Sequence, residues 1–140
     1  MTRKQQREHI FKLLFQSDFI NESELSHHLN AYLEALKEDY LVKGKQLKAT
    51  DLDYIRNKFV AILPLVKELD DTINEKVSGW KTTRMNKGDL SILRLALYEI
   101  NHDEDIPLSV AINEAVELAK KFSGEEGYAF VNGVLAKLIK

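Results

Sequence analysis

Four cationic side chains lie within the first twelve residues, where Glu8 is the only acid: Arg3, Lys4, Arg7 and Lys12. A helix that starts here carries positive charge in its first turn, which the helix macrodipole disfavours by about 0.3–1 kcal/mol per exposed cation. Folding alone gives no reason for this placement, but an anionic partner does, because exposed Lys and Arg neutralise phosphates and release counterions. Arg3 and Arg7 are four residues apart and share a helix face. We predict a polyanion site here, with a merely solvated basic helix start as the alternative.

Other charged groups give weaker grounds for chemistry. Glu114 and Glu117 are neighbours on a helix, as paired carboxylates would be, but Lys121 lies four residues beyond Glu117 and favours a surface ion pair. The histidines show no spacing with carboxylates that is typical of a metal site, and the chain contains no cysteine. We therefore expect no metal, no cofactor and no catalysis.

The composition is typical of a soluble protein with one domain. The 140 residues are 44% hydrophobic and 30% charged, with a formal net charge of −2. A nucleic-acid site must therefore be a local basic patch and not a general coat. No apolar run approaches the roughly 18 residues of a membrane span, and the first residues lack the apolar core of a signal peptide. These features predict a cytoplasmic protein with no membrane contact.

Hydrophobic periodicity is helical along almost the whole chain, and no segment keeps the alternation of a strand for long. The pattern predicts helices over about residues 3–19, 22–43, 50–63, 65–77, 88–101, 107–122 and 125–139. Pro64 should kink or divide the chain where it lies, and Asn86 should cap the helix that follows it. That helix is apolar nearly all round, which places it at the centre of the fold. We predict an all-α architecture of two small bundles packed together.

The pair Asn132-Gly133 lies between apolar residues, which usually indicates a β-hairpin. A hairpin would break an apolar stripe along residues 130–138, so we predict a helix here instead. Gly133 costs about 1 kcal/mol relative to alanine inside a helix. As compensation, we expect a neighbouring helix backbone to approach the small residues Ala129, Gly133 and Ala136 closely.

Several motifs in the C-terminal half resemble the family of the transcription antitermination factor NusB. They are ILRLALYE at residues 92–99, VAINEAVELAKK at residues 110–121 and FVNGVL at residues 130–135, with Trp80, Arg84, Asp89, Pro107 and Phe122. The N-terminal half matches only in pattern. The resemblance implies one RNA-binding domain over residues 1–140, with about seven helices in two three-helix subdomains, about residues 1–78 and 79–140.

The resemblance also implies a function. Proteins similar to NusB bind the boxA element of nascent ribosomal RNA leaders together with the NusE small-subunit ribosomal protein. The resulting complex keeps RNA polymerase from terminating early, without catalysis. Related domains are also fused to RNA cytosine methyltransferases, but this chain has no cysteine nucleophile and no glycine-rich cofactor loop. A second hypothesis is a protein-interaction or homodimerisation module with weakened RNA binding. The small number of cations in the N-terminal basic patch and a pI near 6.1 favour it.

The resemblance assigns further residues to these partners. Phe15 and Phe130 match aromatic positions that contact RNA, where unpaired bases stack on rings beside cations. Core packing is the alternative for both rings. Glu126 matches an acidic position at the border of the RNA site, and Asp89 matches one that contacts the NusE partner. A carboxylate stabilised by the helix macrodipole is the other interpretation of Asp89, and the two are compatible.

Overall fold

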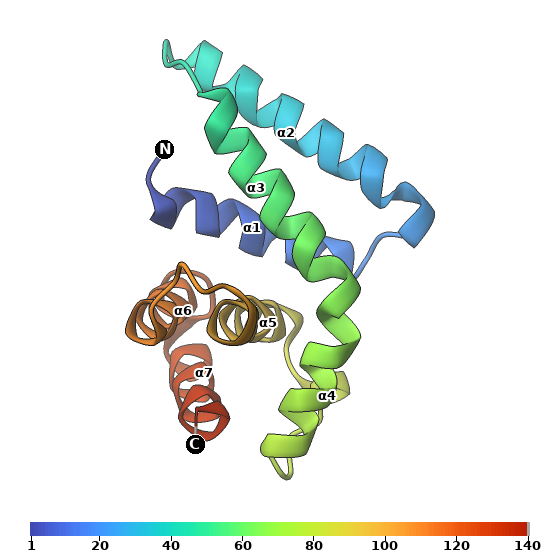
Figure 1. Ribbon diagram of the computed structural model, residues 1–140, viewed down its shortest axis with the longest axis vertical. Coiled ribbons are helices and arrows are strands. Elements are labelled where there is room, and N and C mark those ends of the chain that lie inside the picture. Colours follow the sequence, from blue (N-terminus) through green and yellow to red (C-terminus); the bar gives the residue numbers. More distant parts are fainter. Residues whose placement is uncertain (140) are drawn as a thin grey trace. The chain divides into compact units, whose positions relative to one another are not determined.

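The computed structural model describes residues 1–139, and every regular element in that part of the chain is helical (Figure 1). This confirms the all-α prediction. Contacts divide the chain into two compact units, Met1–Ala61 and Ile62–Lys140. The sequence placed the boundary later, near residue 78, so the helix after Pro64 joins the second unit. Within residues 1–139, no helix is both long and apolar enough to cross a membrane.

Three α-helices form the first unit. With the short 3₁₀ helix η1, their bounds are α1 Arg3–Ser17, η1 Glu22–Glu24, α2 Leu25–Val42 and α3 Ala49–Ile62. Each helix contributes an apolar stripe to the buried residues, namely Ile10, Leu13 and Leu14 of α1, Leu29, Leu33 and Leu36 of α2, and Ile55 and Phe59 of α3. The helical spacing of these positions is the periodicity from which the helices were predicted.

Polar contacts join the three helices of this unit. The His9 Nδ1 atom of α1 lies 2.7 Å from the Tyr32 hydroxyl of α2, and Arg56 of α3 donates to Asn30 Oδ1 of α2 at 2.8 Å. Burial, assisted by the charge of Lys12, lowers the pKa of His9, and burial raises the pKa of Tyr32 to about 12. Both groups are therefore neutral at pH 7, and in this state His9 Nδ1 can accept a hydrogen bond from the Tyr32 hydroxyl.

Four α-helices form the second unit. With two short 3₁₀ helices, their bounds are η2 Leu63–Leu65, α4 Val66–Lys76, η3 Thr82–Arg84, α5 Lys87–His102, α6 Leu108–Phe122 and α7 Gly124–Leu138. Pro64 lies within η2 and divides α3 from α4, as predicted, because proline has no N–H to donate within a helix. Asn86 caps α5, also as predicted, and its Oδ1 atom accepts the N–H groups of Gly88 at 2.8 Å and Asp89 at 3.2 Å.

Helix α5 is the central helix of the second unit. It contacts α4, α6 and α7, and all residues from 90 to 97 are buried. The buried set includes Arg94, whose Nε donates to Asp70 Oδ1 of α4 at 2.8 Å and whose Nη2 donates to Asp70 Oδ2 at 2.7 Å. This bidentate pair is what allows a cation to lie in a helix that is otherwise apolar. Within the second unit, the helix therefore has the central position that its apolar pattern predicted.

Gly133 lies inside α7, so the helical interpretation of Asn132-Gly133 is confirmed. The expected close approach of another helix is wrong. Ala129, Gly133 and Ala136 are exposed, and among the described residues no atom lies within 4 Å of the place where a Gly133 Cβ would stand. Gly127 is the crowded glycine of α7, because a Cβ there would lie 2.2 Å from the Ser123 Cβ and 2.9 Å from Asp89 Oδ1 of α5.

Replacing Gly133 by alanine is therefore expected to raise the free energy of unfolding by about 0.5–1 kcal/mol, because alanine favours the helix and meets no obstacle. Urea denaturation followed by circular dichroism measures the change. The matched control is Gly127→Ala, the same substitution in the same helix. It should lower the free energy of unfolding by about 1–3 kcal/mol, because the new methyl group has no space. A loss of stability in Gly133→Ala would contradict the open surroundings of that residue.

Candidate functional site

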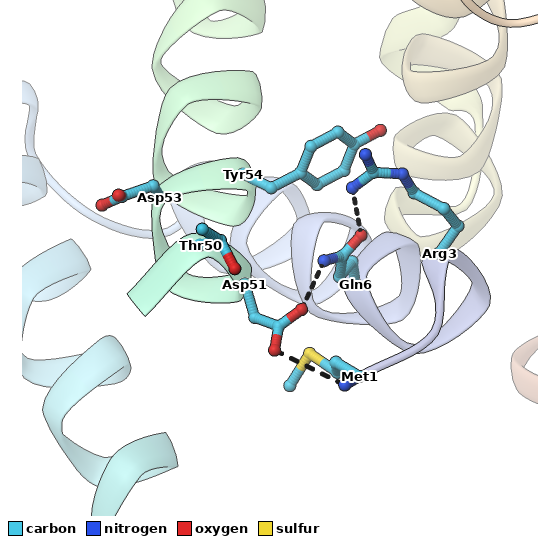
Figure 2. Close-up of a pocket in the computed structure, with 7 residues that line it drawn as sticks. All are labelled: Met1, Arg3, Gln6, Thr50, Asp51, Asp53 and Tyr54. Carbon is cyan, nitrogen blue, oxygen red and sulfur yellow. Dashed lines mark hydrogen bonds and ion pairs between the residues drawn. The ribbon is translucent and has the colours of Figure 1, made fainter. Parts of the chain in front are cut away.

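The side chain of Arg3 lies over the ring of Tyr54 from α3 (Figure 2). Its guanidinium carbon is 3.7 Å from the ring centroid, and its Nη1 donates to Gln6 Oε1 at 2.6 Å. Gln6 Nε2 donates in turn to Asp51 Oδ1 at 2.8 Å, and the Met1 amino group lies 3.4 Å from Asp51 Oδ2. These contacts orient the guanidinium while Arg3 remains exposed, so its charge is accessible to an anion.

The same residues line a cavity of about 490 Å³, to which Thr50 and Asp53 also contribute. In Figure 2, Asp53 points away from the hydrogen-bonded chain that links Arg3 to Asp51. Two carboxylates balance the Arg3 guanidinium and the Met1 amino group, so the cavity has no excess of positive charge to attract a phosphate. A phosphate would therefore approach Arg3 from the solvent side of α1.

The other cations of the predicted basic patch differ in exposure. Lys4 is exposed and Lys12 is half-buried. Arg7 is only 4% exposed, whereas we expected an exposed phosphate contact. Helix phase explains the difference, because Arg7 precedes the buried Ile10 by three residues and lies on the same stripe. Arg3 and Lys4 are thus the exposed cations at the start of α1.

Phe15 also lies on α1, and its side chain is not sealed in the core. The residue is 37% exposed, and its ring centroid is 5.3 Å from that of Phe19, which is 66% exposed. The two rings form a small aromatic surface at the end of the helix. Phe19 was not selected from the sequence, although its spacing of four residues from Phe15 indicates the pair.

In the second unit, Phe130 of α7 contacts the ring of Trp80, in the connection between α4 and η3. The ring centroids are 5.3 Å apart and the rings meet at 67°, edge to face. Trp80 is 54% exposed and Phe130 is half-buried. Both line a cavity of about 430 Å³ together with Arg84, Asp89 and Glu126. The structure thus brings together three of the predicted residues, Asp89, Glu126 and Phe130, and adds Trp80 and Arg84.

Asp89 is the most constrained group in this cavity. It is 8% exposed, and its Oδ1 accepts no hydrogen bond within residues 1–139. Buried carboxylate oxygens normally have a donor, because desolvation without one is costly. Gly127 provides the space for this oxygen, since any side chain there would collide with it. In the described part of the chain this oxygen has neither a hydrogen-bond donor nor contact with solvent, although Asp89 lines the cavity.

The charge of the cavity indicates which ligands it suits. Asp89 and Glu126 are negative and Arg84 is the one cation among its lining residues. Groups that donate hydrogen bonds, such as amino groups, amides or cationic side chains, are favoured over phosphates. Exposed rings beside such a cavity give a recognition site for a planar or apolar group with attached donors.

The fold is that of an all-α protein whose cavities are lined by aromatic and charged side chains. The chain belongs to the NusB family, whose family model matches residues 4–140. It is 48% identical to the transcription antitermination protein NusB of Agathobacter rectalis over 139 residues, which cover 98% of each protein.

Solved structures show the same fold. A crystal form of NusB from T. maritima matches with a TM-score of 0.81 and 31% identity, covering 99% of this chain and 90% of that one. A second match, with a TM-score of 0.73 and 24% identity, covers 99% of this chain and 97% of that one. That chain comes from a crystal structure of the antitermination factors NusB and NusE in complex with double-stranded RNA.

Proposed function

We propose that this chain is a transcription antitermination factor. In the proposal it binds boxA-type single-stranded RNA of ribosomal RNA leaders together with a NusE-type ribosomal protein. The assembly joins the RNA polymerase antitermination complex in the cytoplasm and prevents early termination. The observation that carries the proposal is the Trp80–Phe130 pair, two accessible rings beside a polar cavity in a member of the NusB family. Recognition alone suffices, so no enzymatic step and no cofactor is required.

The RNA contacts follow from the chemistry of unpaired strands, whose bases stack on rings and whose phosphates attract cations. We assign base stacking to Phe130 and Phe15, which both reach the surface. We assign the main phosphate contacts to the exposed Arg3 and Lys4, and a weaker one to the half-buried Lys12. Glu126 borders the RNA at the cavity beside Phe130. Arg7 is buried, so we assign it to the packing of the start of α1 and not to a phosphate contact.

The protein partner is assigned to Asp89. An Arg, Lys or amide donor from a NusE-type protein would form a charge-assisted hydrogen bond with the carboxylate of Asp89, which lines the cavity beside Phe130. A structure of this fold contains NusB and NusE with double-stranded RNA, and NusE is therefore the partner to test first. The first-turn position of Asp89 also allows a favourable interaction of its carboxylate with the α5 macrodipole.

An electrophoretic mobility shift with boxA RNA, in the absence and presence of the NusE-type protein, tests the proposed function. We expect a shift with the chain alone that strengthens when the protein partner is added. A scrambled single-stranded RNA of equal length is the control for charge alone. Absence of a shift under both conditions would overturn the proposed function.

A homodimerisation module of the same fold is the second candidate. The specific observations in its favour are the buried Arg7, which thins the basic patch, and the exposed apolar rings of Phe15 and Phe19. Sedimentation velocity over a range of protein concentrations distinguishes the two functions. A dimer that persists at low concentration, combined with no RNA shift, would support this candidate over RNA binding.

The proposal makes a prediction about salt. RNA affinity falls with salt, and the slope of the logarithm of the binding constant against the logarithm of the salt concentration measures this dependence. Replacing Arg3 and Lys4 together by alanine should reduce the size of this slope by about 1.4, because each contact with a single-stranded phosphate contributes about 0.7. Titrations at several salt concentrations measure the slope. Lys37→Ala on α2 with Lys43→Ala at the C-cap of that helix removes the same charge and serves as control. Equal slopes for wild type and the Arg3/Lys4 variant would exclude those side chains from phosphate contact.

A further inference from the structure

A second cavity adjoins the Trp80–Phe130 pair. Its volume is about 190 Å³, and both rings line it together with Ala129, Gly133 and Lys137 of α7. We name it the Gly133 hollow. It lies toward the C-terminal end of α7 from Phe130, whereas Glu126 places the larger cavity toward the N-terminal end. The aromatic pair therefore has a recess on each side along the helix.

Gly133 keeps this hollow open. No atom of the described residues lies within 4 Å of its absent Cβ, so neither packing nor a close helix contact requires glycine here. The backbone is helical and does not use a positive φ angle either. Glycine lowers helix stability at an interior position. A glycine that weakens the helix and serves no packing contact is explained if the space above it is used by a ligand.

The charge of the hollow differs from that of the larger cavity. Lys137 is the only charged residue that lines it, whereas the larger cavity contains two carboxylates and one guanidinium. A phosphate is therefore favoured beside the hollow and disfavoured beside Asp89. The volume is below the range of about 300–1,000 Å³ for drug-sized ligands, which suits a single flat base.

We propose that the Gly133 hollow binds a second unpaired base of the same RNA strand, stacked against the Trp80–Phe130 pair, with its phosphate at Lys137. The inference rests on the proposed RNA function and adds a base site to those assigned to Phe130 and Phe15. From Glu126 to Lys137 the helix rises about 16 Å, a length along which a single strand can place consecutive nucleotides. The favoured occupant is RNA because the hollow combines the exposed ring of Trp80 and the half-buried ring of Phe130 with a lysine.

The test fills the hollow without removing a contact. Gly133→Leu places a side chain in the open space and favours the helix, and Ala136→Leu adds the same bulk at an exposed position of α7 outside the hollow. Fluorescence anisotropy with a labelled single-stranded boxA RNA measures the affinity. We expect Gly133→Leu to weaken binding about tenfold or more, Lys137→Ala to weaken it and lower the salt slope, and Ala136→Leu to bind like wild type. Circular dichroism melting verifies that each variant is folded.

The outcomes separate the two proposals. Wild-type affinity in Gly133→Leu, with Phe130→Ala impaired, would overturn the second base site and leave the proposed function standing. Absence of RNA binding by the wild-type chain itself would overturn both. If Gly133→Leu retained RNA affinity but lost the NusE-type protein, the hollow would be a protein contact and the inference would be wrong.

Discussion

Replacing Asp70 by alanine is expected to lower the free energy of unfolding by about 3 kcal/mol. Asp70 accepts both hydrogen bonds of a bidentate pair from Arg94, a guanidinium that is 5% exposed in the central helix α5. Removing one partner of a buried pair leaves the other charge desolvated, which costs about 3–5 kcal/mol. The Asp70 side chain is 20% exposed, so the pair is not fully buried and we expect a loss of stability at the lower end of this range.

The next residue provides the control. Asp71 pairs with Lys67 at 2.9 Å on the same helix, but these side chains are 62% and 88% exposed. Such an exposed pair contributes little to stability, so Asp71→Ala should unfold almost like wild type. Urea denaturation of the two variants measures the difference. Equal stability of Asp70→Ala and Asp71→Ala would contradict the structural role of the Asp70–Arg94 pair.

Replacing Phe130 by alanine is expected to weaken the binding of single-stranded boxA RNA by roughly 5- to 150-fold, the equivalent of one lost base stack of about 1–3 kcal/mol. The substitution removes one ring of the Trp80–Phe130 pair, which separates the larger cavity from the Gly133 hollow. Anisotropy titration with labelled RNA measures the loss. It should be larger than for any single lysine, since stacking and edge contact with Trp80 are lost together.

Tyr128 is the matched aromatic control on the same helix. Its ring lies 5.1 Å from Lys120 Nζ and lines neither of the two cavities beside Phe130. Tyr128→Ala should therefore change RNA affinity less than twofold. Similar losses in the two variants would indicate a general effect on α7 and would contradict a specific base contact at Phe130.

Periodicity and caps allowed much of the fold to be predicted. The apolar spacing gave the helices, Pro64 gave the break before α4, and Asn86 gave the start of α5. The central position of α5 followed from its lack of a polar face, since a helix that is apolar all round must be covered on all sides. These are local rules, so a single sequence contains the information they require.

The surroundings of single residues could not be predicted in the same way. Arg7 was expected at the surface because charges usually are, but the phase of α1 places it on the buried stripe. A close helix contact was expected at Gly133, but the surroundings of Gly133 are open and the crowded glycine is Gly127, beside the side chains of Ser123 and Asp89. Periodicity gives the face on which a residue lies and does not determine which atoms pack against it.

The candidate site was predicted in part. Asp89, Glu126 and Phe130 were selected through the family resemblance, and the structure places them around one cavity. Trp80 and Arg84 were recognised as residues that match the family, but nothing in the sequence assigned them a role. The contact of Trp80 with Phe130 joins positions fifty residues apart, and sequence spacing does not reveal it. Tyr54 escaped notice for the same reason, since it meets Arg3 only after α1 and α3 have packed.

The intrinsic fluorescence of Trp80 tests the central claim most directly. It is the only tryptophan in the chain, so its emission reports on the proposed RNA site alone. We predict that titration with single-stranded boxA RNA quenches this emission saturably, and that a duplex of the same sequence does so much more weakly because its bases are already stacked. RNA binding in a mobility shift with no change in Trp80 emission would contradict the placement of the site at the Trp80–Phe130 pair.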